Sequence, residues 1–253
     1  MLLEGKRIII TGSTSGIGRA TAVAAAAEGA AVVVSGRRQA EAENAVAEIT
    51  AAGGTAHAVC GDVAEAGFGE ELVAEGTKLL GGLDGVVSAA GIIVRATAED
   101  TSDDDWARQM AVNVDGTFRV SRAAVPRLRA SGGGSIVNVS STCGTVGAAG
   151  LAGYCASKGA VISLTQAMAL EVSAEQIRVN AVCPGAIETP MLADGHAEGV
   201  TIDQVRAANL ASIPQNRIPG PEEVADLIMF LLSDRSRHIT GADLAIDGGY
   251  TAQ

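Results

Sequence analysis

The sequence predicts an α/β fold in which a doubly wound parallel sheet forms a single domain. Three observations lead to this class. Short runs rich in Val and Ile alternate with longer stretches of helical period, these runs are apolar at consecutive positions, and no linker, repeat or low-complexity segment divides the 253 residues. Strands that are apolar on both faces are typical of a parallel sheet covered by helices on its two sides. Right-handed crossovers between such strands then place helices on both faces of one sheet.

Each element follows from its local pattern. Helices are expected from Ile17 to Glu28, up to about Ala52, around Trp106–Arg129 and over Tyr154–Glu171. Strands are expected over residues 7–10, 31–35, 55–60, 83–89, 135–140, 177–182 and 242–246.

The stretch from Met191 to Ile213 breaks this alternation, because it has no strong period and is rich in Ala, Gly and Asp. An irregular segment of this length in a compact domain is typically a lid or a binding loop. We therefore expect a substrate lid at about residues 190–213.

Composition and charge exclude several function classes. Hydrophobic residues make up 47% and charged residues 19% of the chain, and the formal net charge is −11. Nucleic acids and anionic membranes both bind basic surfaces, so neither is an expected partner. No apolar run reaches the ~20 residues that span a bilayer, and the N-terminus lacks the pattern of a cleaved signal, so a cytoplasmic protein is expected. The cysteines and histidines are scattered without metal-site spacing, which predicts reduced thiols and no bound metal: Cys60, Cys143, Cys155, Cys183, His57, His196 and His238.

A glycine-rich loop follows the first expected strand. In "TGSTSGIG" (11–18), Gly12, Gly16 and Gly18 allow a tight turn and a close approach of the backbone to a ligand. The N–H groups at the start of the next helix suit a pyrophosphate. The spacing is G-x-x-x-G-x-G, and such glycines can also be purely structural. Their place on the first strand of a doubly wound sheet favours a dinucleotide.

The end of the second strand bears on the choice of dinucleotide. NAD-binding folds place an acidic residue about twenty residues after the glycine loop, to hold the ribose 2′-OH. Here Gly36 occupies that point within "SGRR" (35–38), and Arg37 and Arg38 follow. Guanidinium groups bind a 2′-phosphate well, which favours NADP(H); a solvated pair of charges at a helix start is the alternative.

"YCASK" (154–158) places Tyr154 and Lys158 four residues apart, on one face of an expected helix. A phenol has a pKa near 10 and is a poor base at neutral pH. An ammonium about 4 Å away, at an effective dielectric constant of about 20, stabilises the phenolate by about 4 kcal/mol. The spacing therefore suits a proton-transfer pair, although a tyrosine on a helix surface would show the same pattern.

Four motifs in this order resemble those of the short-chain dehydrogenase/reductase family: "TGSTSGIG", "VNVSS" (137–141), "YCASK" and "CPGAIETP" (183–190). The resemblance covers nearly the whole chain, from Gly5 to about Gly249. The Y-x-x-x-K motif alone is weak, but with the glycine loop and Ser141, thirteen residues before Tyr154, the set is specific. The resemblance implies a Rossmann fold, an NAD(P) cofactor and hydride transfer between the nicotinamide and a carbonyl group.

The resemblance also assigns roles. Tyr154 would be the general acid/base, and Lys158 would lower its pKa and hold the nicotinamide ribose. Ser141 would hydrogen-bond the reacting oxygen, and Asn113 would hold the water of a proton relay. The residues assigned to the cofactor are Gly12, Ser15, Gly16, Ile17, Gly18, Arg37, Arg38, Asp62, Val63, Ala90, Gly91, Tyr154, Lys158, Pro184, Gly185, Ile187 and Thr189. One departure is "SAAG" (88–91), where Ala89 replaces the usual central Asn, so a hydrogen bond that braces the central strands is lost or supplied by another group.

The expected walls of the substrate site are residues 142–151 and the lid. The first wall, "TCGTVGAAGL", is small and mostly apolar and has no Lys or Arg, so a neutral ketone or secondary alcohol is expected. The resemblance to 3-oxoacyl-carrier-protein reductases is general, and an acidic carrier would need a basic docking face. Arg119, Arg122, Arg127 and Arg129 lie on one expected helix and could form one, but a solvated face or a subunit interface is the favoured interpretation.

Two other function classes were weighed. A methyltransferase also uses a glycine loop in such a sheet, but it has no need of Ser141, Tyr154 and Lys158 together. A non-catalytic dinucleotide-binding sensor or scaffold is expected to have lost one of the three, and all are present. For assembly, the apolar tail at 239–250 and the two long helices favour a homotetramer, because they would otherwise leave apolar surface and a strand edge exposed.

Overall fold

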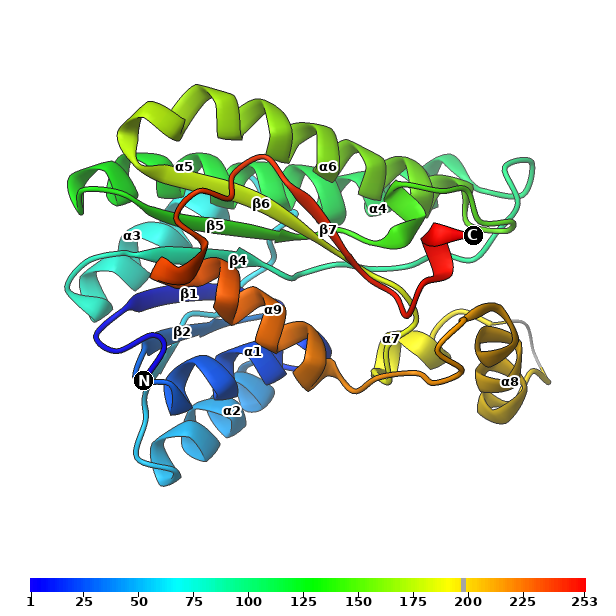
Figure 1. Cartoon of the computed structure of the whole chain (residues 1–253), viewed down its shortest axis with the longest axis horizontal. Helices are drawn as coiled ribbons and strands as arrows, with labels where there is room; N and C mark the ends of the chain where they lie inside the picture. The colour runs from blue at the N-terminus through cyan, green and yellow to red at the C-terminus, as the bar shows by residue number, and fades with distance from the viewer. Residues whose placement is uncertain (197–198) are drawn as a thin grey trace.

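The computed structural model describes residues 1–196 and 199–253. Within this part of the chain, seven strands form one parallel sheet in the order β3-β2-β1-β4-β5-β6-β7 (Figure 1). The predicted doubly wound α/β fold is confirmed. The strands are β1 (Arg7–Thr11), β2 (Ala31–Ser35), β3 (Thr55–Ala58), β4 (Gly85–Ser88), β5 (Gly134–Val139), β6 (Ile177–Pro184) and β7 (Asp243–Ile246).

Helices cover both faces of the sheet (Figure 1). One face carries α1 (Gly16–Ala27), α2 (Gln39–Ala51) and α9 (Pro221–Leu232), and the other carries α3 (Phe68–Leu80), α5 (Gly116–Ala130) and α6 (Ala152–Val172). Short 3₁₀ turns complete the chain at Thr142–Gly144, Ser173–Glu175, Asp234–Ser236 and Tyr250–Ala252. No helix among the described residues is long and apolar enough to cross a bilayer.

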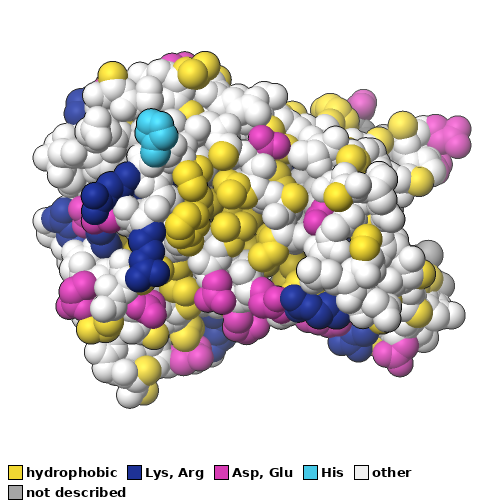
Figure 2. Space-filling view, viewed as in Figure 1, with side chains coloured by type: hydrophobic (Ala, Val, Ile, Leu, Met, Phe, Trp, Pro, Cys, Tyr) yellow, Lys and Arg dark blue, Asp and Glu magenta, His cyan; other side chains and the backbone are white. Residues whose placement is uncertain are grey.

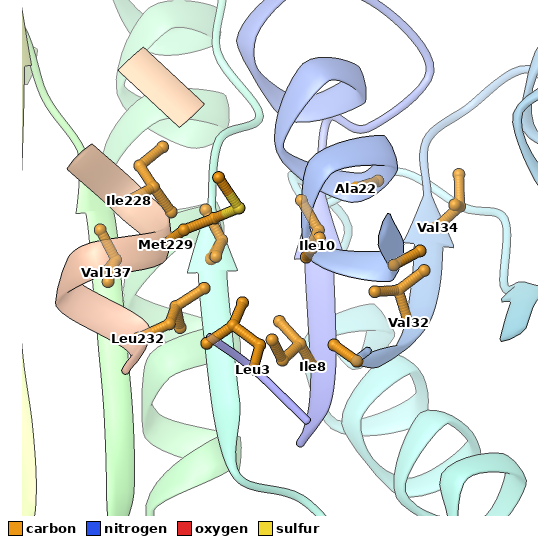
Figure 3. Packing of buried hydrophobic residues seen from close by; sticks show 14 of the residues in the cluster. Leu3, Ile8, Ile10, Ala22, Val32, Val34, Val137, Ile228, Met229 and Leu232 are labelled. Atoms are coloured by element: carbon orange, nitrogen blue, oxygen red, sulfur yellow. The ribbon is translucent and has the colours of Figure 1, made fainter. Parts of the chain in front are cut away.

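The apolar strands supply two cores. In β1, Ile8 and Ile10 pack with α1 and α9 in one core, whereas Ile9 packs in the core on the opposite face. Figure 3 shows Ile8 and Ile10 beside Val32 and Val34 of β2. Because side chains alternate along a strand, a strand with both faces covered is apolar at every position. This alternation is why β1 reads as a continuous run of isoleucines.

The helix expected around Trp106–Arg129 is divided in the structure. It consists of α4 (Asp103–Met110), a π-helical turn (Ala111–Asp115) and α5. The Ser102 hydroxyl accepts from the backbone N–H of Asp105 and caps α4. Single π turns occur often at functional sites, and this one carries Asn113 into the interior.

The segment expected to be an irregular lid is partly helical. It contains α7 (Pro190–Ala193) and α8 (Ile202–Ser212), so the prediction of an irregular stretch was wrong for these residues. Thr201 and Gln204 form a capping box that starts α8, a signal that is readable in the sequence. The expected lid range also includes residues 197–198, which lie outside the described part of the chain.

The sheet topology fixes where a ligand can bind. β1 pairs with β2 on one side and with β4 on the other, so the winding direction reverses at β1. Loops at the carboxyl ends of strands diverge at such a point and leave a crevice. In Figure 1, α7 and α8 lie beyond this end of the sheet.

Candidate active site

A cavity of about 640 Å³ lies at the carboxyl ends of the strands. The loops that follow β1 to β6 form its floor and sides, and residues of α7, α8 and the C-terminal turn close it. Every residue predicted to bind the cofactor lines this cavity, as do three of the four predicted catalytic residues. The lining set is Gly12, Ser15, Gly16, Ile17, Gly18, Arg37, Arg38, Asp62, Val63, Ala90, Gly91, Ser141, Tyr154, Lys158, Pro184, Gly185, Ile187 and Thr189.

The glycine loop forms a tight cradle at the start of α1. Gly12 has φ +63°, and a Cβ there would lie 2.7 Å from the backbone of Ala90. A Cβ on Gly18 would lie 2.4 Å from the carbonyl oxygen of Gly12. Both positions therefore require glycine, and the loop presents backbone N–H groups at the first turn of a helix. These residues fit a dinucleotide whose pyrophosphate binds at a helix N-terminus.

Thr11 braces the segment that contains Ala89. Its hydroxyl oxygen accepts from the backbone N–H groups of Ala89 and Ala90, at 3.1 and 3.2 Å. Thr11 is at the end of β1, and the two acceptor bonds tie that strand to the end of β4. The backbone at position 89 is thus braced by another strand, whichever side chain this position carries.

The two predicted arginines line the cavity just after β2. Arg37 Nη1 lies 3.8 Å from Asp62 Oδ2, and Arg38 Nε lies 3.0 Å from Glu41 Oε1. Both guanidinium groups are largely exposed, and ion pairs of this kind contribute little. A Cβ on Gly36 would lie 2.7 Å from Cγ2 of Thr14. The Thr14 side chain therefore fills the place where an acidic side chain would begin.

Tyr154 and Ser141 meet on the buried wall of the cavity. Each is 7% exposed. Ser141 ends the loop after β5, where its Oγ accepts from the Cys143 N–H at 3.1 Å and caps the following 3₁₀ turn. Ser141 also lies close enough to the Tyr154 phenol to lower the pKa of that phenol. The two hydroxyl groups can therefore bind one carbonyl oxygen.

Lys158 lies one helical turn beyond Tyr154 on α6 and is 4% exposed. Its ammonium donates to the carbonyl oxygen of Val139 at 2.9 Å and lies 5.7 Å from the centre of the Tyr154 ring. Burial lowers the pKa of Lys158 from 10.5 to about 8, against smaller opposite effects of Cys183 and Cys143. The ammonium is held without a carboxylate partner among the described residues.

The pKa of Tyr154 differs from the prediction. Burial is the largest effect and raises the pKa of the phenol well above its ordinary value, and Cys143 raises it further. The groups that lower it are Ser141, through its hydrogen bond, and Arg95, through its charge. A net lowering by Lys158 is therefore not what this structure shows, because the ammonium points to Val139 and desolvation outweighs it. The phenol is protonated at neutral pH.

Asn113 does not line the cavity but lies directly behind it. Its Oδ1 accepts from the Ile92 N–H at 2.8 Å, and its Nδ2 donates to the Ile92 carbonyl and to Ser157 Oγ, both at 3.0 Å. Asn113 therefore connects the π turn, the loop after β4 and α6. The role of holding a relay water stays a prediction.

The structure also brings two arginines to the cavity that the sequence analysis did not assign. Arg95 follows β4, and its Nε donates to the carbonyl oxygen of Asp194 at 2.9 Å; Arg108 is exposed on α4. Residues 142–151 thus contain no Lys or Arg, but other segments place positive charges in the cavity. The sequence held one indication that Arg95 reaches the cavity. It comes four residues after Gly91, so it follows a strand at the carboxyl edge of the sheet, where the cavity lies.

The four cysteines are free, and among the described residues no group of three His, Cys, Asp or Glu side chains could hold a metal ion. Cys143 nevertheless lines the cavity beside Tyr154, and burial raises the pKa of its thiol. The spacing of the cysteines gave no indication of this placement.

Comparison with known proteins decides the family. A family model described as Enoyl-(Acyl carrier protein) reductase matches residues 12–251. A short-chain type dehydrogenase/reductase from Mycobacterium marinum superposes with a TM-score of 0.92 at 36% identity, covering 99% of this chain and 97% of that one. The chain belongs to the short-chain dehydrogenase/reductase family.

Two relatives illustrate the range of this family. The 2-(S)-hydroxypropyl-CoM dehydrogenase 3 of Xanthobacter autotrophicus is 39% identical over 250 residues, which cover 99% of this chain and 98% of the relative. The 3-oxoacyl-[acyl-carrier-protein] reductase FabG of Thermotoga maritima is 39% identical over 249 residues, 98% and 99% of the two chains. The predicted resemblance is confirmed, and this family member is an oxidoreductase that uses NAD(P).

Proposed function

We propose that the protein is an NADP(H)-preferring oxidoreductase that transfers a hydride between the nicotinamide and a ketone or secondary alcohol, with Tyr154 as general acid/base. The observation that carries this proposal is the burial of Ser141, Tyr154 and Lys158 on one cavity wall that continues into the glycine cradle. The nicotinamide supplies the hydride when it is bound. The proposal is tested by following nicotinamide absorbance with a panel of ketones and both reduced cofactors.

The chain's own groups position the carbonyl and supply the proton. Tyr154 and Ser141 hydrogen-bond the same oxygen, which fixes the angle at which the carbon is approached. Tyr154, protonated at neutral pH, gives its proton to that oxygen as the alcohol forms. Lys158, four residues along α6, then stabilises the phenolate and holds the ribose. Because its pKa is raised, the phenol carries at neutral pH the proton that carbonyl reduction consumes.

A ketone or secondary alcohol suits this wall for two reasons. Residues 142–151 are small and mostly apolar, which leaves room for carbon substituents on both sides of the reacting centre. The relative from Xanthobacter is named for a 2-hydroxypropyl substrate, whose hydroxyl group is that of a secondary alcohol. The predicted neutrality of the substrate rested on the first wall alone and does not account for Arg95.

The preference for NADP(H) rests on Gly36, Arg37 and Arg38. Position 36 offers no carboxylate to a ribose 2′-OH, and Thr14 fills the adjacent space. Both arginines line the cavity and pair only with the half-buried carboxylates of Asp62 and Glu41, which a phosphate of about −2 charge can replace. Ser15 limits the preference for NADP(H), because a Lys or Arg at that position of the glycine loop would add a second contact to the 2′-phosphate.

We expect kcat/KM to be ten- to a hundred-fold higher with NADPH than with NADH, the value of about one hydrogen bond to a charged group. Arg37→Ile and Arg38→Ile should each lower the NADPH value with little change for NADH. Thr14→Ala/Gly36→Asp/Arg37→Ile should reverse the preference, because the first change makes room for the acid. Steady-state kinetics with both cofactors measures this, with Arg235→Ile as a control away from the cavity.

A wild type that already works better with NADH would show that Arg37 and Arg38 do not bind a phosphate. In that case the protein is an NAD(H)-dependent secondary alcohol dehydrogenase of the same family.

A 3-oxoacyl-carrier-protein reductase is the second candidate, because FabG of Thermotoga maritima is a full-length relative. The expected basic docking face on α5 is weak, however. Arg119, Arg122 and Arg129 form ion pairs with Asp115, Glu70 and Glu175. These pairs neutralise three of the four arginines that an acidic carrier would contact.

We further propose a homotetramer. β7 is an edge strand of the sheet, and Figure 2 shows hydrophobic side chains gathered across the middle of the face that β7 and α9 occupy. Trp106 on α4, Phe118 on α5 and Leu170 on α6 are 45%, 40% and 83% exposed. Strand edges and apolar patches of this kind are usually covered.

Light scattering at micromolar concentration should therefore give four times the chain mass of 25.3 kDa. Leu170→Lys should lower that mass, whereas Leu79→Lys, at a 38% exposed position of α3, should not. A monomer mass for the wild type would refute the assembly.

A further inference from the structure

We propose that Arg95 forms an anion-binding subsite in the substrate half of the cavity, so that the ketone or alcohol converted there carries a carboxylate or a similar anionic group. This inference rests on the proposed function and names its substrate class. It was not expected from the sequence, where the apolar wall at 142–151 predicted a neutral substrate.

The position of Arg95 is fixed from two sides. The next residue, Ala96, pairs with Leu151 in an isolated parallel bridge, which ties this loop to the wall that leads into α6. On the other side, Arg95 Nε donates to the carbonyl oxygen of Asp194, just after α7. The side chain therefore spans the opening between the apolar wall and the lid.

The guanidinium group lies on the substrate side rather than at the adenine end. Arg95 lines the same cavity as Tyr154 and Cys143, and its charge acts on both of these groups. The cations assigned to the cofactor, Arg37 and Arg38, lie instead beside Asp62 and Glu41. A cation at this place would contact the substituents of the substrate, because the reacting carbonyl group binds at the general acid.

Arg95 has unused capacity to bind an anion. Nine arginines of the described chain form ion pairs with carboxylates, but none of the described carboxylates lies within 4.0 Å of Arg95. Burial lowers the pKa of Arg95 and outweighs the charges of Tyr154, Cys143 and Asp194, which raise it. One of its five N–H donors binds Asp194, and the paired Nη groups match the two oxygens of a carboxylate.

Arg108 reinforces the positive charge of this half of the cavity. It lines the same cavity from α4. Its neighbour Gln109 accepts from the backbone N–H of Val94 at 3.1 Å, so α4 is held against the loop that carries Arg95. Because Arg108 is exposed, solvent screens its charge, and we assign it a smaller share of the effect.

The test compares keto acids with their methyl esters. For 4-oxopentanoate, 5-oxohexanoate and 6-oxoheptanoate, kcat/KM should exceed that of the matching ester by ten- to a hundred-fold for at least one chain length. Arg95→Gln should bring that ratio close to one. Arg95→Lys, which keeps a charge without the planar fork, should retain part of the ratio. Arg108→Gln should lower it less.

Arg127→Gln is the matched control, because it removes an exposed arginine of α5 that does not line the cavity. It should leave the acid-to-ester ratio unchanged. If Arg95 only braces the lid through Asp194, Arg95→Gln lowers kcat/KM for acid and ester together and the ratio persists. A persistent ratio, or a wild type that reduces the ester as well as the acid at every chain length, overturns the proposal.

A binding experiment separates this inference from the proposed function. Saturation-transfer NMR compares hexanoate with hexanamide on wild type and Arg95→Gln, without any turnover. Stronger binding of hexanoate to the wild type alone supports the subsite even if no ketone is reduced, in which case the proposed function is what fails. Equal binding of hexanoate and hexanamide to the wild type overturns the subsite whatever the kinetics show.

Discussion

Replacing Tyr154 by Phe is expected to lower kcat by 10²–10⁴-fold or more while leaving the cofactor dissociation constant nearly unchanged. Tyr154 is 7% exposed, so Phe fits the same space and removes only the hydroxyl group. General acid catalysis typically contributes this factor. Stopped-flow fluorescence of cofactor binding, together with steady-state turnover, measures both quantities.

Tyr250 provides the matched control, because it is the only other tyrosine and also lines the cavity. Tyr250→Phe should remain within about tenfold of wild-type turnover, since Tyr250 is not assigned to proton transfer. A collapse of cofactor affinity in Tyr154→Phe, in step with turnover, would assign Tyr154 a structural role instead.

Lys158→Met is expected to lower turnover and cofactor affinity together, yet to stabilise the protein at neutral pH. The buried ammonium has its pKa lowered from 10.5 to about 8. Protonated Lys158 therefore opposes folding, by about 3 kcal/mol for a shift of this size. In the variant the carbonyl oxygen of Val139 loses its hydrogen-bond donor, which reduces the gain in stability by about 1 kcal/mol. The net gain in the free energy of unfolding is about 2 kcal/mol.

The gain depends on pH in a defined direction. Between about pH 8 and 10.5 the unfolded chain holds the Lys158 proton and the folded chain does not, so wild-type stability rises with pH across this window. The advantage of Lys158→Met is complete below pH 8 and shrinks above it. Urea unfolding at pH 7 and pH 9.5 measures the change. The readings stay below pH 10, where titration of Tyr154 acts in the opposite sense.

Lys78→Met is the control for this pair of measurements, because Lys78 is an exposed lysine of α3. It should change stability by less than about 0.5 kcal/mol at either pH. If Lys158→Met is less stable than wild type at pH 7, burial of the protonated ammonium does not destabilise the folded protein. The lowered pKa assigned to Lys158 is then wrong.

Local patterns were enough to predict the sheet and the cofactor cradle. The run of isoleucines in β1 is apolar because helices cover both of its faces, and Gly18 is required by a contact with Gly12 in the same loop. These features depend on neighbours close in sequence or on the period of a strand. The capping box of α8 was equally local, and its helix was missed because the stretch lacks a strong apolar period.

The missed features depend on contacts between distant segments. Arg95 reaches the substrate half of the cavity because its loop meets Leu151 and Asp194, which lie far along the chain. The raised pKa of Tyr154 depends on how deeply α6 is buried, which a four-residue spacing cannot show. Likewise, Thr11 accepts from the backbone N–H of Ala89 although the two residues are 78 positions apart in the sequence.

The most direct test of the account is the transfer of a labelled hydride. Reduced cofactor that carries deuterium at C4 of the nicotinamide is incubated with the protein and a ketone that it consumes, and the product is examined by mass spectrometry and NMR. The account predicts one deuterium on the carbinol carbon in the wild type, and a strongly reduced rate of label transfer in Tyr154→Phe. Cofactor that binds but passes no label to any carbonyl compound would contradict it and would favour a non-catalytic dinucleotide-binding protein.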